Sequence, residues 1–178
     1  KDAEELERRL RKSAEDLKRS AEEMKKRLDK SREDVKRKVE EAKKIVEDLE
    51  EDLKKRDTDD ELLERTLKTL EKILDELEKD LRDNNKRLRE DVERHKKETE
   101  ENNRRLRREV EEVERKGLSE EMVKRLRELL RTHEEITERI NRKIEKLLRE
   151  HEEETKRLLD DLRRLLEELR KKIEEEKR

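Results

Sequence analysis

The strongest constraint on the fold is a line of residues spaced alternately three and four positions apart. One stretch of it comprises Leu81, Asn84, Leu88, Val92, His95, Thr99, Asn102 and Leu106. This spacing places the side chains on one face of an α-helix. Asn, His and Thr therefore stand where a hydrophobic core is expected. The sequence predicts a long helix whose buried face carries polar groups.

Two short segments divide the chain into three such helices. Thr58 and Glu61 have the spacing of a capping box. Gly117 suits the left-handed residue that follows a helix, and Ser119 suits the cap of the next one. We expect helices at about 1–56, 59–116 and 119–178. Because short connections make neighbouring helices antiparallel, we predict an all-α fold: an up-down-up antiparallel three-helix bundle, one elongated and nearly straight unit over residues 1–178.

Composition excludes several classes of protein. Charged residues make up 63% of the chain, and it contains no Pro, Cys or aromatic residue. No apolar run reaches the length of a membrane span, and no targeting signal is recognisable. The charges are mixed in sign and no aromatic side chain can stack on a base, so we expect no nucleic-acid binding. We expect a soluble protein without cofactor or small-molecule ligand, and the sequence does not identify its compartment.

The polar core positions fall at matching heights on the three helices. Antiparallel helices place two residues at one height when their numbers have a constant sum, and three Ser residues meet this condition with Asn or His of the second helix. A second sum connects these residues to the third helix. We predict three buried layers: Ser13/Asn102/His133, Ser20/His95/Asn141 and Ser31/Asn84/His151. The same sums pair Thr99 with Thr137 and Asn103 with Thr132 as extensions of the networks.

Such layers have a physical purpose in a repetitive Leu-rich bundle. A buried hydroxyl, amide or imidazole costs several kcal/mol unless a hydrogen-bond partner is present. A bundle with polar groups at matching heights satisfies all of them in one register only. The layers are therefore predicted to specify the register of the helices.

Two chemical readings of the same residues are less favoured. Ser, His and Asn could serve as nucleophile, base and orienting residue. We expect no catalysis, because the bundle is too narrow for a pocket and has no Gly-rich backbone for an oxyanion hole. We expect no metal site either, since helical rise separates successive His layers by roughly 10 and 16 Å. A pH response remains open, because a buried neutral His resists protonation.

The segment Gly117–Glu121 (GLSEE), the lack of Pro and aromatics, the Glu/Lys/Arg surface and the Ser/His/Asn layers resemble de novo designed helical bundles with buried hydrogen-bond networks. This resemblance covers the whole chain. It implies a recombinant scaffold with no natural biochemical activity. Some such bundles dissociate in acid through His layers, which the resemblance implies for His95, His133 and His151. A spectrin-like spacer is the nearest natural alternative, but the core aromatics of such repeats are missing.

The third helix also carries a second apolar line. It consists of Val123, Leu130, Leu148, Leu159 and Leu166, and the first helix offers only Ala14, Ala21 and Ile45 opposite it. We favour a wider buried stripe in a monomer. A module that self-associates or accepts another helix is the alternative.

Overall fold

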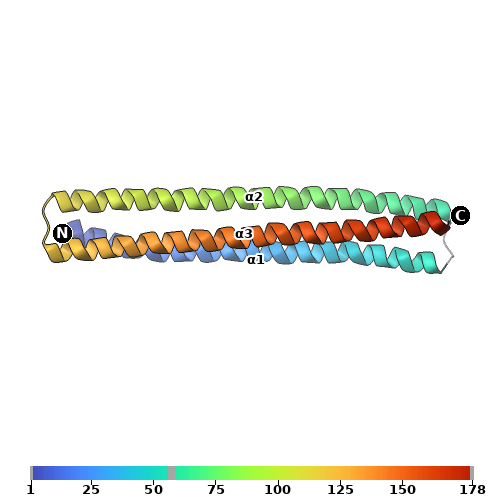
Figure 1. The fold of residues 1–178 in the computed structure, drawn as a ribbon, viewed down its shortest axis with the longest axis horizontal. Coiled ribbons are helices and arrows are strands. Elements are labelled where there is room, and N and C mark those ends of the chain that lie inside the picture. Colours follow the sequence, from blue (N-terminus) through green and yellow to red (C-terminus); the bar gives the residue numbers. More distant parts are fainter. Residues whose placement is uncertain (1, 56–58, 177–178) are drawn as a thin grey trace. The chain divides into compact units, whose positions relative to one another are not determined.

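The computed structural model describes residues 2–55 and 59–176, which form three helices (Figure 1). These are α1 (Asp2–Lys54), α2 (Asp60–Arg115) and α3 (Glu120–Glu176). The prediction of an all-α three-helix fold is confirmed, and the helix ends lie within two residues of the predicted ones. The predicted cap Thr58 lies outside the described residues.

The connection between α2 and α3 follows the local rules for helix ends. Gly117 has φ 91°, and its backbone N–H donates to the carbonyl of Glu114 at 3.1 Å. A residue without a side chain takes this left-handed conformation at little cost. Ser119 Oγ then accepts a hydrogen bond from the backbone N–H of Met122 at 3.3 Å. These two residues end one helix and begin the next.

The chain packs into two compact units. Unit 1 comprises Lys1–Leu28 and Leu88–Arg149, and unit 2 comprises Asp29–Arg87 and Glu150–Arg178. Each unit takes one segment from each of the three helices. Each is therefore a three-helix bundle with its own core.

The core of unit 1 shows how its segments run. Leu10 clusters with Leu106 and Leu126, whereas Leu28 clusters with Leu88 and Leu148. Residue numbers that rise along α1 fall along α2 and rise again along α3. Neighbouring segments are therefore antiparallel, as the short connections require. Each fully buried Leu stabilises this packing by roughly 1.5–3 kcal/mol.

The core of unit 2 is built in the same way from the other parts of the helices. It contains two clusters, one around Leu49, Leu70 and Leu169 and one around Val39, Leu81 and Leu159. Most of the second apolar line of α3 belongs to the cores of the two units. Leu130, Leu148, Leu159 and Leu166 are buried and Val123 is half-buried, whereas Ile45 of α1 is 42% exposed.

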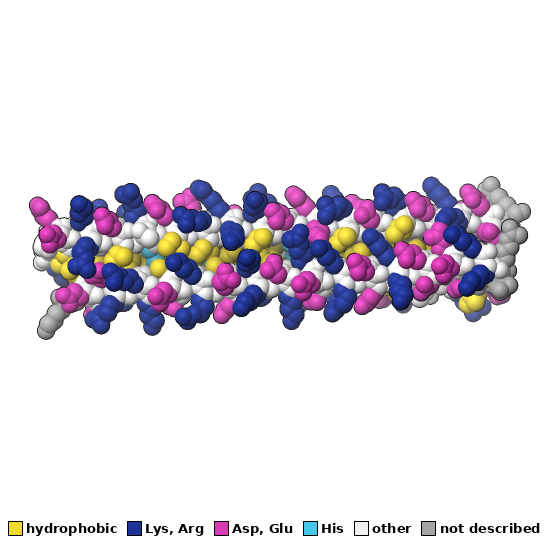
Figure 2. Space-filling view, turned by 90° about the horizontal axis from the view of Figure 1, so that it is seen from below, with side chains coloured by type: hydrophobic (Ala, Val, Ile, Leu, Met, Phe, Trp, Pro, Cys, Tyr) yellow, Lys and Arg dark blue, Asp and Glu magenta, His cyan; other side chains and the backbone are white. Residues whose placement is uncertain are grey.

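Charged side chains of both signs cover the surface. Lys and Arg alternate with Asp and Glu over the face drawn in Figure 2, with hydrophobic side chains visible between them. Several of these charges pair across helices: Arg127 contacts Glu114, and Arg107 contacts Glu134, each at 2.7 Å. Exposed pairs of this kind contribute about 0–1 kcal/mol each. Among the described residues, no helix has the length and apolarity that crossing a bilayer requires.

Candidate functional site

The first polar layer joins all three helices in unit 1. Ser13 Oγ of α1 lies 2.8 Å from Nε2 of His133 on α3. Asn102 of α2 donates from Nδ2 to the same oxygen at 2.8 Å. His133 is only 2% exposed. The serine oxygen therefore bridges the imidazole and the amide.

Unit 2 contains the same arrangement. Ser31 Oγ lies 2.9 Å from Nε2 of His151, and Asn84 donates from Nδ2 to Ser31 Oγ at 2.7 Å. His151 is 1% exposed. The buried Ser/His/Asn hydrogen-bond network predicted from the sequence is present in both units.

The remaining layer, in unit 1, is built differently. Ser20 Oγ lies 2.8 Å from Nε2 of His95 and also donates to the carbonyl of Leu17 at 3.2 Å. Asn141 donates from Nδ2 to Thr99 Oγ1 at 3.0 Å. Among the described residues, Asn141 and Ser20 form no hydrogen bond with each other. His95 is half-buried, unlike the other two histidines. This layer consists of two separate pairs, Ser20–His95 and Thr99–Asn141, and lacks the serine bridge of the other two.

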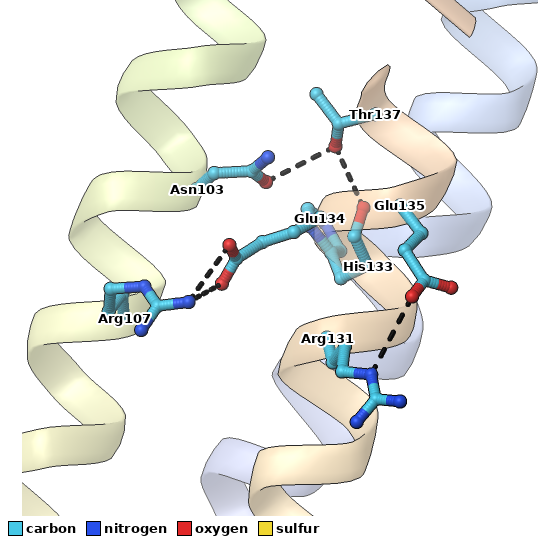
Figure 3. A network of polar contacts seen from close by, with 7 residues as sticks. All are labelled: Asn103, Arg107, Arg131, His133, Glu134, Glu135 and Thr137. Carbon is cyan, nitrogen blue, oxygen red and sulfur yellow. Dashed lines mark hydrogen bonds and ion pairs between the residues drawn. The ribbon is translucent and has the colours of Figure 1, made fainter. Parts of the chain in front are cut away.

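Both predicted threonine extensions are wrong in their pairing. Thr137 Oγ1 contacts Oδ1 of Asn103 at 3.2 Å and the carbonyl of His133 at 2.9 Å (Figure 3). Thr99 pairs with Asn141, and Thr132 lies exposed on the surface of α3. The actual partners on α3 lie four or five residues further along the helix than predicted. Both actual pairs obey one constant sum, about one turn larger than the sum taken from the layers. The layers did not fix this alignment of α2 and α3, because Asn102 and His133 each bond Ser13 and not one another.

The layers based on Ser13 and Ser31 are copies of one module. Every member of the first recurs 18 residues away on its helix, which is five full turns and therefore the same face. The corresponding pairs are Ser13 and Ser31, Asn102 and Asn84, Asn103 and Asn85, His133 and His151, and Thr137 and Thr155. Asn85 and Thr155 were missed from the sequence. The repeat, together with the Thr that follows each His by four residues, is the signal that would have found them.

The two copies differ in one contact. Thr155 Oγ1 donates to the carbonyl of His151 at 2.8 Å, but Oδ1 of Asn85 is buried without a hydrogen-bond partner. In the other copy, the corresponding Asn103 oxygen has Thr137 as its partner. The second copy is therefore less completely satisfied than the first.

The same ring atom, Nδ1, lacks a hydrogen-bond partner in all three histidines. Nδ1 of His95, of His133 and of His151 is buried and has no hydrogen-bond partner. Nε2 faces a serine in each case, so either tautomer leaves Nδ1 unpaired. An unpaired buried polar atom costs about 1–3 kcal/mol. The layers therefore specify contacts at some expense in stability.

Burial lowers the pKa of each histidine below its ordinary value. Desolvation is the main cause for His95, His133 and His151. Nearby carboxylates oppose the shift: Glu98 raises the pKa of His95, and Glu134 raises that of His133. Asn141 also favours the charged form of His95, although no hydrogen bond of ordinary geometry reaches Nδ1. The direction agrees with the expectation that these side chains are held neutral.

The expectation that the bundle has no pocket is wrong for unit 1. A groove of about 540 Å³ opens between α1 and α2, and its lining includes Ser13, Ser20, His95, Thr99 and Asn102. The Ser20–His95 pair thus borders solvent, which explains why His95 is only half-buried. The pair lacks a partner that would orient Nδ1, as catalytic Ser–His pairs require. Within residues 2–55 and 59–176, no cluster of three His, Asp or Glu side chains could hold a metal ion.

Comparison with known proteins supports the fold. A solved structure described as a "Computationally designed three helix bundle" matches with a TM-score of 0.56 and 22% sequence identity, over 98% of this chain and 83% of that chain. No protein-family model matches the chain, and a search of curated proteins found no match. At the level of the fold, the predicted resemblance to designed three-helix bundles is confirmed.

Proposed function

We propose that the chain is a designed structural scaffold whose helices are aligned by its buried polar layers. The observation that carries this proposal is the bridging serine. Ser31 Oγ contacts both His151 and Asn84, so one atom links α1, α2 and α3. Ser13 does the same with His133 and Asn102.

The energetic argument rests on what a register slip would do. Moving one helix by a turn would set Leu or Val side chains against the buried imidazole and amide. Each polar atom that lost its partner would cost about 1–3 kcal/mol. Hydrophobic packing alone gives similar free energies to different registers of a Leu-rich bundle. The polar contacts therefore supply most of the free-energy difference between the correct register and a slipped one.

Comparing one broken layer with one deleted layer tests this role. Asn102→Leu should lower the free energy of unfolding, because the half-buried Ser13 loses a donor and the buried His133 loses part of its network. Replacing the layer by Ser13→Ala, Asn102→Leu and His133→Leu together should be near neutral or stabilising, since no unpaired group remains. Chemical cross-linking between α1 and α2 should show mixed registers only in the triple variant. Equal denaturant midpoints and one register in both variants would contradict the proposal.

A second candidate function is a response to acid. It is supported by the lowered pKa of His95, His133 and His151, which makes protonation oppose folding. The scaffold role does not depend on this response. A pH comparison described below distinguishes the two.

A further inference from the structure

One edge of α3 in unit 1 is more apolar than the bundle requires. Besides its fully buried residues, α3 carries a stripe of half-buried hydrophobic side chains at intervals of seven, seven, four and seven residues. These are Met122, Leu129, Ile136, Ile140 and Leu147. Such intervals keep the stripe on one face of the helix. The stripe repeats as a seam does in a two-helix contact.

The facing edge of α1 does not cover this stripe. Ala21 lies opposite Ile140 and Leu147, and together with Ile144 these side chains wall a groove of about 240 Å³. An alanine is too short to fill the space between two helices at ordinary packing distance. Ala14, one heptad earlier, is also half-buried. Beside Ala21, the apolar edge of α3 at Ile140 and Leu147 is thus partly open to solvent, whereas Met122 and Leu129 also pack against the core of unit 1.

The rim of this groove is mainly basic. Lys18 and Lys25 of α1 and Lys143 of α3 line it, with Glu22 as the one acidic residue. In the part of the chain that the structure describes, none of these three lysines has a recorded ion pair. Elsewhere in unit 1, Lys96 pairs with Glu145 at 3.0 Å. The groove therefore combines an apolar floor with a rim of net positive charge.

We propose that this lysine-rimmed groove of unit 1 docks one amphipathic helix from another chain, with an apolar stripe and acidic flanks. A helix suits the site because the stripe from Met122 to Leu147 extends about 38 Å at helical rise. The backbone groups of α1 and α3 are already paired, so recognition must come from side chains, as in helix-in-groove binding. Carboxylates on the flanks would meet Lys18, Lys25 and Lys143.

A second copy of this chain fits the groove less well. An isologous dimer brings the same surface of both copies together. The lysines of one rim would then face the lysines of the other. The three large hydrophobic residues that are exposed in the described chain, Ile45, Leu62 and Ile73, all belong to unit 2 and do not extend the groove.

Binding of a labelled synthetic helix to the full chain tests the proposal. The probe is a peptide of about 26 residues with Leu at alternate three- and four-residue spacing and Glu on both flanks, compared with a matched peptide carrying Lys there. Fluorescence anisotropy should give at least about tenfold tighter binding of the Glu peptide. Failure of the Glu peptide to bind, or equal affinity of the two peptides, would overturn the proposal.

Two variants locate the site. Ala21→Leu should fill the groove and weaken binding about tenfold without lowering the denaturant midpoint, so lost binding would not reflect misfolding. Lys18→Glu/Lys25→Glu/Lys143→Glu should also weaken binding about tenfold. The matched control, Lys26→Glu/Lys97→Glu/Lys146→Glu, makes the same change in net charge at exposed positions outside the groove and should bind normally. Equal losses in the two triple variants, unchanged binding by Ala21→Leu, or a dimer that Ala21→Leu dissociates would overturn the proposal.

Discussion

Ser31 Oγ and His151 Nε2 lie 2.9 Å apart although 120 residues separate them in the sequence. The same spacing of 120 residues separates Ser13 from His133. Because the Ser and His numbers differ by the same amount in both pairs, the two contacts specify the same register of α1 against α3. The effect of removing these contacts on the free energy of unfolding is therefore the most direct measure of how much the layers stabilise the fold.

Ser31→Ala should destabilise the protein more than Ser20→Ala. Removing Ser31 Oγ leaves both His151 and Asn84 without a partner in a buried layer, which should cost about 2–3 kcal/mol. Removing Ser20 Oγ affects only His95, which borders a groove where water replaces the lost bond, so about 1 kcal/mol is expected. Guanidinium unfolding gives both values. Equal losses would show that the serine bridge has no special weight.

Asn85 and Asn103 should respond in opposite directions to replacement by Leu. Oδ1 of Asn85 is buried and unpaired, so Asn85→Leu should raise the free energy of unfolding by about 1 kcal/mol. Asn103→Leu removes the partner of Thr137 and should lower it by about 1 kcal/mol. The two positions are equivalent in the repeat, so each serves as the control for the other. Destabilisation by Asn85→Leu would mean that its amide is satisfied in solution.

Acid should destabilise the wild-type protein through its histidines. The pKa of each is lowered on folding, so the unfolded chain binds more protons below about pH 6.5. The contribution to stability is complete above that value and is lost as the pH falls through this window. Glu98, Glu134, Glu152 and Glu154 reduce the shifts, while Arg32 increases that of His151.

The measurement is guanidinium unfolding at about pH 7.5 and about pH 4.5 for the wild type and for His95→Asn/His133→Asn/His151→Asn. Carboxylates titrate in both proteins, so the difference between the two drops isolates the histidines. We expect the larger drop in the wild type. Equal drops would remove the acid response and leave the layers with the register role alone.

Gly117→Ala should cost about 1 kcal/mol in the free energy of unfolding. The residue has φ 91°, and an added Cβ would meet no atom within 4 Å. The expected cost therefore comes from the backbone conformation and not from a steric clash. Gly117→Asn should cost less, because Asn tolerates this conformation better. Thermal unfolding of both variants checks the order, and an Ala variant as stable as wild type would contradict it.

The sequence by itself determined the helices and the first contacts between them. A three-and-four spacing admits only the helical period, and Gly117 with Ser119 has one ready interpretation as the end of one helix and the start of the next. Short connections then fix the antiparallel order. Because that order makes the number sums constant, the pairing of Ser13 with Asn102 and of Ser31 with Asn84 followed from arithmetic.

Only the tertiary structure decided how the remaining polar groups pair and what stays open. Thr99 meets Asn141 and Asn103 meets Thr137 in an alignment of α2 and α3 about one turn away from the one that Asn102 and His133 suggest, because those two residues meet through Ser13 and not directly. Likewise, Ala21 on α1 leaves a groove only because Ile140 and Leu147 lie opposite it. Periodicity assigns a residue to a face, but the volume and direction of the side chains across the interface decide which atoms touch.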